Sequence, residues 1–107
     1  MRKTKYLSVY ITANDLKEAR KIAYHLVEHK LAACVNVIPE MTGIYHWEGK
    51  VREGKEVVMV IKTRRKLFAK LEKAVKKLHS YEVPCIVGFP IEKGHAPFLN
   101  WIKDGTK

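Results

Sequence analysis

The spacing of apolar and polar residues predicts that strands and helices alternate along the chain. Lys5–Thr12 alternates apolar with polar side chains, as a strand with one buried face does. An apolar stripe with helical spacing then predicts a helix over Asp15–Lys30, with Asn14 as its capping residue. The stripe consists of Leu16, Ala19, Ala23, Leu26 and Val27. The chain therefore begins with a strand and a helix.

The middle of the chain predicts a long β-ribbon. Residues that favour strands fill Cys34–Ile38 and Val57–Thr63, and the alternating segment Gly43–Val51 lies between them. Pro39 cannot donate to a strand ladder, so we expect a kink or bulge after the first of these segments. Glu53-Gly54 offers turn residues that would fold the middle segment back onto the last one. This ribbon is longer than the core of a small domain requires.

The last third predicts a helix, a strand and a short helix. Leucines at near-heptad spacing predict a second long helix from Leu67 to Leu78, and Val83–Ile91 has the pattern of a strand. Pro97 suits the first turn of a short final helix. The side chains of this helix that we expect to face inward are Phe98, Trp101 and Ile102.

This order of elements predicts an α+β fold of the ferredoxin-like class. In that split β-α-β sandwich both long helices cover one face of an antiparallel sheet. A long β-hairpin and a short C-terminal helix are added to it. The 107 residues, of which 47% are hydrophobic, suit a single domain over 1–107.

Charge and cysteine content narrow the classes of function. The formal net charge of +10 is compatible with binding to nucleic acid or acidic surfaces. However, the lysine row, Lys66, Lys70, Lys73 and Lys77, forms one stripe on the second helix, which is typical of a solvated helix face. Cys34 and Cys85 fall in different predicted strands, so we expect both to be reduced in a cytoplasmic protein. No apolar run approaches the length of a membrane span.

Several blocks of the chain resemble the signature blocks of the CutA family, the divalent-cation tolerance proteins. They are Leu31–Asn36, Ile44–Lys50, Glu56 with Lys62–Thr63, His79–Pro84 and Leu99–Ile102. The blocks have the same order and similar spacing over nearly the whole chain, so together they are more specific than any single motif. Three residues depart from the pattern. His46 stands where an aromatic residue is common, Ser80 replaces a proline, and Phe98 replaces a tyrosine.

The resemblance implies a tight homotrimer with hairpins that pair between neighbours. It also implies binding of copper or another divalent cation and a role in metal tolerance. The trimer has an independent physical reason, since an unpaired strand edge is a template for pairing and cyclic closure prevents open-ended filaments. The expected interface residues are Trp47, Glu48, Gly49, Lys50 and Trp101.

Three residues are candidate metal ligands in clefts between subunits. The Cys34 thiolate and the His79 imidazole suit copper or zinc, and Glu82 adds an oxygen ligand. Structural roles compete with this interpretation, since Cys34 can be a small buried apolar residue and His79 can cap a helix. The residues expected to line the cleft are Tyr45, Trp47, Lys62 and Tyr81.

Two further patterns involve charged residues and histidines. A buried Lys62 would need a carboxylate partner, and Glu48, Glu56 or Glu82 could supply one across the interface. His25 and His29 are four residues apart on the first helix, a spacing able to chelate a metal at the surface.

The function therefore has one leading hypothesis and two alternatives. The alternatives are a trimeric signalling or scaffold protein of the PII type that binds a small anion or a partner, and a nucleic-acid-binding module that uses the lysine row. The sequence contains no glycine-rich phosphate loop, paired catalytic carboxylates or nucleophile–base motif. We accordingly expect a protein that is not an enzyme and needs no cofactor for folding.

Overall fold

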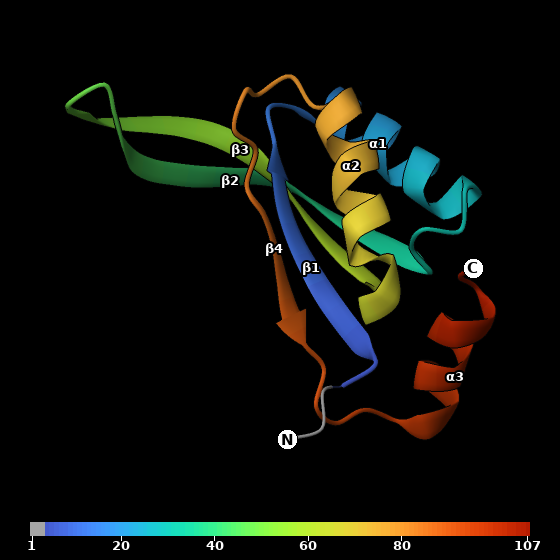
Figure 1. The fold of residues 1–107 in the computed structure, drawn as a ribbon. Helices are drawn as coiled ribbons and strands as arrows, with labels where there is room; N and C mark the ends of the chain where they lie inside the picture. The colour runs from blue at the N-terminus through green and yellow to red at the C-terminus, as the bar shows by residue number, and fades with distance from the viewer. Residues whose placement is uncertain (1–3) are drawn as a thin grey trace.

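A four-stranded antiparallel sheet forms the centre of the molecule, in a computed structural model that describes residues 4–107. The strand order is β2-β3-β1-β4, and α1 and α2 cover the same face of the sheet (Figure 1). The elements are β1 (Tyr6–Ala13), α1 (Leu16–Glu28), β2 (Cys34–Trp47), β3 (Lys50–Arg64), a 3₁₀ turn (Arg65–Leu67), α2 (Phe68–Leu78), β4 (Ile86–Pro90) and α3 (Ala96–Asp104). The ferredoxin-like fold predicted from the sequence is confirmed.

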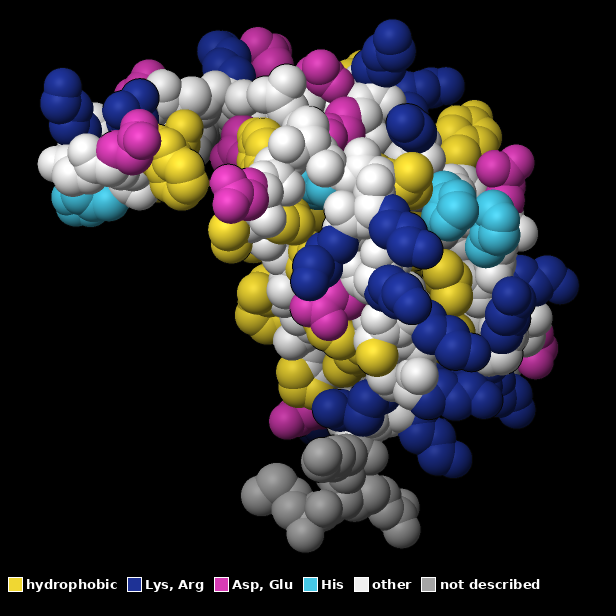
Figure 2. Space-filling view, turned by 45° about the horizontal axis from the view of Figure 1, so that its top comes forward, with side chains coloured by type: hydrophobic (Ala, Val, Ile, Leu, Met, Phe, Trp, Pro, Cys, Tyr) yellow, Lys and Arg dark blue, Asp and Glu magenta, His cyan; other side chains and the backbone are white. Residues whose placement is uncertain are grey.

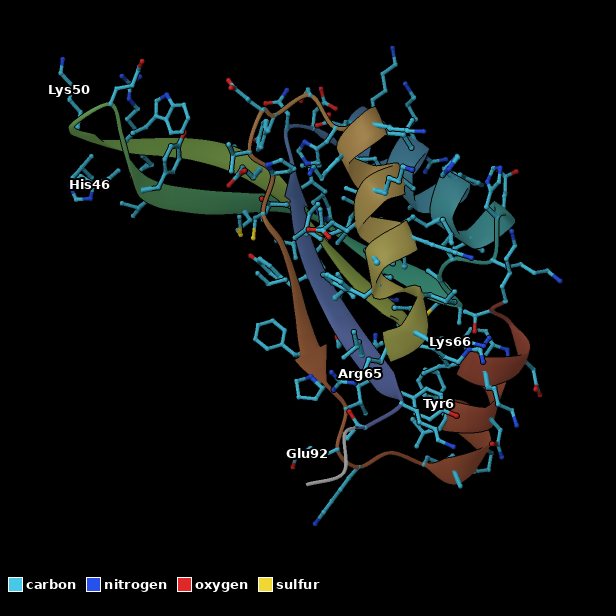
Figure 3. All side chains as sticks on the ribbon, in the orientation of Figure 1. Tyr6, His46, Lys50, Arg65, Lys66 and Glu92 are labelled. Carbon is cyan, nitrogen blue, oxygen red and sulfur yellow. The ribbon has the colours of Figure 1, made fainter. Side chains whose placement is uncertain are left out.

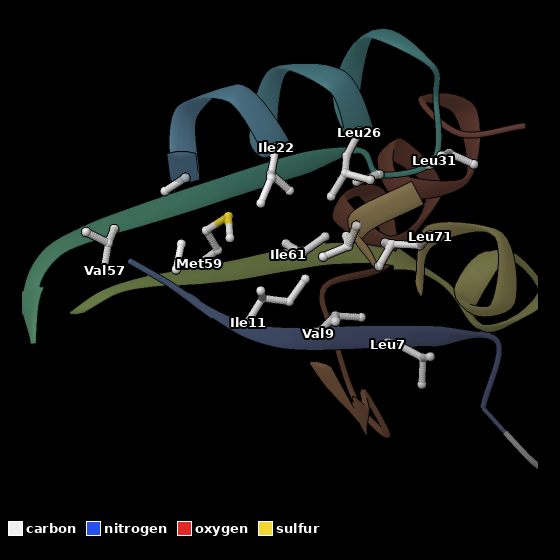
Figure 4. Close-up of a cluster of buried hydrophobic side chains, with 14 residues drawn as sticks. Leu7, Val9, Ile11, Ile22, Leu26, Leu31, Val57, Met59, Ile61 and Leu71 are labelled. Atoms are coloured by element: carbon white, nitrogen blue, oxygen red, sulfur yellow. The ribbon is translucent and has the colours of Figure 1, made fainter. Parts of the chain in front are cut away.

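The core lies between the sheet and the two long helices (Figure 4). Its fully buried side chains include Val9, Ile11, Ile22, Leu26, Met59, Ile61, Leu71 and Val75. The strand residues alternate and the helix residues recur every three or four positions, so both sets meet in one layer. Each such side chain contributes about 1.5–3 kcal/mol when it leaves water.

The first helix differs in detail from its prediction. Asp15, not Asn14, is the N-cap, and its side-chain oxygen accepts a hydrogen bond of 2.8 Å from the backbone N–H of Glu18. Leu16 and Val27 were expected in the buried stripe but are exposed. At 100° per residue they lie roughly 70–90° around the helix from the centre of the stripe that is buried.

The turn of the long hairpin was predicted at the wrong glycine. Trp47 pairs with Lys50, so the chain reverses at Glu48-Gly49. Both residues have positive φ, 51° and 77°, as a two-residue turn of type I′ requires. Gly54 lies inside β3, opposite Gly43.

The expected irregularity after Pro39 is confirmed. The register of β2 against β3 shifts between Ile38 and Met41, and Glu40 there has a φ of 58°. One strand therefore carries an extra residue at this point, which is a β-bulge.

The end of the chain contains two corrections. β4 covers only Ile86–Pro90, because the segment before it is a loop in which Val83 is exposed. In α3 only Ile102 is buried, whereas Phe98 and Trp101 are exposed and stack on each other with their ring centroids 5.5 Å apart. Within the described residues, no helix has the length and apolar character that crossing a membrane requires.

The hairpin turn can be tested with two matched glycine substitutions. Gly49→Ala places a side chain at a φ of 77°, which costs about 1–2 kcal/mol. We expect the amides of the hairpin tip to exchange with deuterium about 5–30 times faster. Gly54→Ala is the control, since a Cβ there meets the Tyr45 hydroxyl at an ordinary 3.7 Å. Equal effects of the two substitutions on exchange would place the turn elsewhere.

Candidate functional site at the base of the hairpin

The hairpin leaves the body of the protein where β1 ends. β1 pairs with β3 only from Val57 to Arg64, so the part of β3 before Val57 pairs with β2 alone. Figure 3 shows the labelled His46 and Lys50 near the tip of this projection, far from Tyr6 and Arg65 at the other end of the sheet. The loop between α2 and β4 lies beside the base of the hairpin (Figure 1). The candidate site is built from this loop and this base.

His79 is buried at the base with both ring nitrogens hydrogen-bonded. Its Nε2 lies 2.7 Å from the carbonyl oxygen of Thr12, and the backbone N–H of Tyr81 donates to its Nδ1 over 3.1 Å. In the tautomer in which Nδ1 accepts, Nε2 donates to the Thr12 carbonyl oxygen. A metal could bind His79 only after one of these bonds is broken.

Glu18 joins the start of α1 to the same loop. Its carboxylate accepts hydrogen bonds from the backbone N–H groups of Asn14 and Ser80, and it lies 3.9 Å from Nδ1 of His79. Burial raises the pKa of Glu18, but the hydrogen bonds from Asn14 and Ser80 outweigh it, and the charge of His79 lowers this pKa further when its imidazole is protonated. The net pKa is therefore below its ordinary value.

A second pair lies directly at the hairpin base. The Tyr81 hydroxyl donates to Glu56 Oε2 over 2.9 Å, and Glu56 folds over Gly43 of the opposite strand. Burial, together with the hydrogen bond and charge of Glu56, raises the pKa of Tyr81. Burial and Glu56 also raise the pKa of Cys85. The sequence did not predict that Cys85 lies near Glu56, because nothing in the residues around Cys85 indicates this contact.

One chain does not bring the predicted metal ligands together. Cys34 pairs with Lys62 of β3, whereas the Thr12 that holds His79 pairs with Val58. Four residues of strand separate these two positions on β3, about 13 Å. In residues 4–107 no group of three or more His, Cys, Asp or Glu side chains could hold a metal ion. A metal site that one chain makes from Cys34, His79 and Glu82 therefore does not fit the structure.

Lys62 has an uncharged partner within its own chain. Its Nζ donates to Asn36 Oδ1 over 3.2 Å. The structure describes no ion pair between Lys62 and Glu48, Glu56 or Glu82, so a carboxylate partner across an interface stays a prediction.

Apolar side chains are exposed on the hairpin and along β4. Trp47 is 53% exposed, and it lies in a set with Ile44, Tyr45, Val51, Val87 and Phe89. Figure 2 shows apolar side chains in the angle between the projecting hairpin and the body, whereas Lys and Arg gather over the helices. Exposed apolar surface of this extent is typical of an interaction site.

The lysine row is exposed along the 3₁₀ turn and the outer face of α2. No lysine of this row belongs to an ion pair that the structure describes. This exposure suits a solvated helix face as well as a nucleic-acid contact, and the second of these stays a prediction.

Comparison with known proteins identifies close relatives. The family model described as CutA1 divalent ion tolerance protein matches residues 7–105. The divalent-cation tolerance protein CutA of Archaeoglobus fulgidus is 48% identical over 96 residues, 90% of this chain and 93% of that protein. The protein of the same name from Thermus thermophilus is 46% identical over 98 residues, 92% of this chain and 95% of that protein.

Solved structures agree with the sequence relatives. The structure of the divalent cation tolerance protein from Thermus thermophilus has a TM-score of 0.93 at 44% identity, covering 95% of this chain and 99% of that one. CutA1 from Oryza sativa has a TM-score of 0.95 at 36% identity, covering 98% of this chain and 96% of that one. A relative from Arabidopsis thaliana is named chloroplastic, so similar proteins occupy more than one compartment and a cytoplasmic location stays a prediction here.

The Glu18 contacts predict a pH-dependent stability. A carboxylate whose pKa is lowered by folding stabilises the protein above its ordinary pKa, and this contribution is lost as the pH falls through its pKa in the folded state. Glu18→Gln should lower the free energy of unfolding by roughly 1 kcal/mol at pH 7. Denaturant unfolding should show the difference from wild type shrinking as Glu18 becomes protonated. Glu28→Gln, an exposed change on the same helix, should show no such trend.

Proposed function

Because this chain belongs to the family of CutA1 divalent ion tolerance proteins, we propose that it is a homotrimer that binds a copper-type divalent cation. In this proposal the metal binds in clefts between subunits, and binding serves metal-ion tolerance. The observation that carries the proposal is the hairpin, which extends past the sheet with exposed apolar side chains.

The trimer follows from the shape of the ribbon. An isolated two-stranded hairpin is only marginally stable in water. β2 and β4 are also the two edges of the sheet, so within residues 4–107 each leaves a row of backbone groups without a strand partner. Pairing with a neighbouring copy satisfies both the edge and the apolar side chains, and Trp47 is the natural anchor because large aromatics dominate interface energetics. The exposed Trp101 on α3 is a second expected contact.

The metal site follows from which donors are free. Cys34 is half-buried and unpaired with Cys85, and Glu82 is exposed. These two side chains can reach a metal that a neighbouring copy helps to hold. His79 is left out of the proposed donor set, since its two nitrogens already hold the loop to β1. In this proposal His79 positions Tyr81 and Glu82.

The trimer predicts a mass near three chains by analytical ultracentrifugation. Trp47→Ala should weaken association by about 2–4 kcal/mol, the usual loss at an aromatic hot spot, and give smaller species on dilution. Tyr24→Ala is the matched control, since Tyr24 is an aromatic residue on α1 that is 59% exposed and far from the hairpin. A wild-type protein that is monomeric at all concentrations would refute the trimer.

The metal site predicts saturable binding of Cu²⁺ in calorimetric titration, with weaker binding of Zn²⁺. Cys34→Ser should lower both affinities at least tenfold, roughly the range seen even for loss of an outer partner, and Cys85→Ser is the matched control. Zn²⁺ is included because it cannot oxidise the thiol. Unchanged affinity in Cys34→Ser would remove the proposed donor.

The role of His79 is decided in the same titration. His79→Ala should lower the free energy of unfolding by about 1–3 kcal/mol, because the Thr12 carbonyl and the Tyr81 N–H lose their partner. Metal stoichiometry should stay unchanged in the folded variant. Loss of binding without loss of stability would instead make His79 a ligand.

A further inference from the structure

Two histidines at the C-terminal end of α1 form a cluster outside the hairpin base. His25 lies in the last turn of α1 and His29 is the C-cap residue. Residues four apart lie on the same face of a helix, and here the two imidazole rings stack with centroids 4.0 Å apart and an interplanar angle of 27°. Figure 2 shows histidine side chains side by side on the surface over the helices.

The hydrogen bonding of His29 leaves one nitrogen free for a ligand. Its Nδ1 lies 2.9 Å from the backbone carbonyl oxygen of His25, so Nδ1 carries the proton and donates it. The Nε2 atom of this exposed ring then keeps its lone pair. Histidines that bind metals usually donate their other N–H to a carbonyl or carboxylate in this way, which fixes the tautomer and the ring orientation. His29 is thus already arranged as a ligand.

The spacing of the rings suits one shared ion. Two imidazole nitrogens that each lie 2.0–2.1 Å from a metal are roughly 3 Å apart. The rings are close enough for one ion to reach both, with centroids 4.0 Å apart, but a metal binds in the plane of each ring, so the stacked rings must rotate about their side-chain torsions until their free nitrogens converge. Both residues are on one helix, so the geometry does not depend on a second copy of the chain.

The electrostatics of the helix end also favour a cation. The C-terminus of a helix carries a partial negative charge, which attracts positive charge within the last turn. Glu28 precedes His29 and is exposed, whereas Lys30 follows His29 and Lys21 lies one turn before His25. The helix end and Glu28 thus offset part of the repulsion from these two lysines.

The sequence from His25 to His29 is His-Leu-Val-Glu-His, which has the H-x-x-E-H spacing of one class of zinc peptidases. A catalytic zinc needs three protein ligands and an open position. Among residues 4–107 no third His, Cys, Asp or Glu completes such a group with this pair. The motif here therefore supplies two ligands and no catalytic centre.

We propose that His25 and His29 form a two-histidine surface site for a divalent cation that prefers imidazole, such as Ni²⁺, Cu²⁺ or Zn²⁺. Water completes the coordination. This site is separate from the proposed cleft between subunits and does not depend on it, since Cys34 and Glu82 take no part.

Calorimetric titration of the full chain with Ni²⁺ tests the site, because Ni²⁺ binds imidazole and does not oxidise thiols. The wild type should bind one Ni²⁺ per chain at this site. His25→Gln and His29→Gln should each lower its affinity at least tenfold, roughly the size of effect that loss of even an outer partner produces. The control His95→Gln removes a histidine at the N-cap of α3 and should leave the affinity unchanged.

Two further measurements keep the result specific. Ni²⁺ should raise the melting temperature of the wild type and of Cys34→Ser, but not that of the two histidine variants, whose melting without metal reports their folding. Absence of saturable Ni²⁺ binding in the wild type overturns the proposal. Equal affinity in His25→Gln, His29→Gln and wild type also overturns it. Because Cys34→Ser acts on the cleft alone, failure of one site is distinguished from failure of the other.

Discussion

Strand β3 has to serve two environments along one continuous strand. From Val57 onward it lies between β1 and β2, and its side chains such as Met59 and Ile61 are buried in the core. Before Val57 it pairs with β2 alone and projects from the body (Figure 1). The projecting half inherits its register from the buried half, since a slip of one residue would turn Met59 and Ile61 away from the core. The position of every exposed hairpin residue is therefore set by packing inside the domain.

The base of the hairpin is held by polar contacts where four segments meet. Thr12 lies near the end of β1, Glu18 lies in the first turn of α1, and Glu56 lies on β3. The loop that carries His79 and Tyr81 connects α2 to β4. Buried polar groups are costly unless they are paired, and within the described residues no buried side-chain nitrogen or oxygen lacks a partner. The network therefore fixes the loop without a metal. It also explains why His79, which the family resemblance selects as a metal ligand, uses both ring nitrogens in hydrogen bonds that hold the structure.

Sequence patterns predicted the order and type of the elements, because the periods of two and 3.6 residues follow directly from backbone geometry. They could not choose between Glu48-Gly49 and Glu53-Gly54, which are the same dipeptide. The position of the turn is set by strand pairing elsewhere in the hairpin. Ile38 pairs with Val58, and the extra residue of the bulge then centres the reversal between Glu48 and Gly49. Local turn chemistry contains no information about that pairing.

The candidate site was predictable only in part for the same reason. The family resemblance selected residues 79–84, but the partners of His79 and Tyr81 come from segments 67 and 25 positions away in sequence. The exposure of Phe98 and Trp101 has a related cause. Their apolar character indicates burial, yet the single chain covers only Ile102 of α3. The apolar character of a residue thus predicts that it will be buried, but it does not predict whether its own chain or a neighbouring chain buries it.

The two proposed metal sites differ in what the fold must do to build them. His25 and His29 are brought together by helix geometry alone, since four residues make about one turn. Cys34 begins β2, whereas Glu82 lies in the loop between α2 and β4, whose Tyr81 contacts Glu56 at the base of the hairpin. In the proposed trimer, closure of three chains into a ring would bring these donors together. A site that combines these donors would then be a property of the proposed assembly, and the same closure would also bury Trp47.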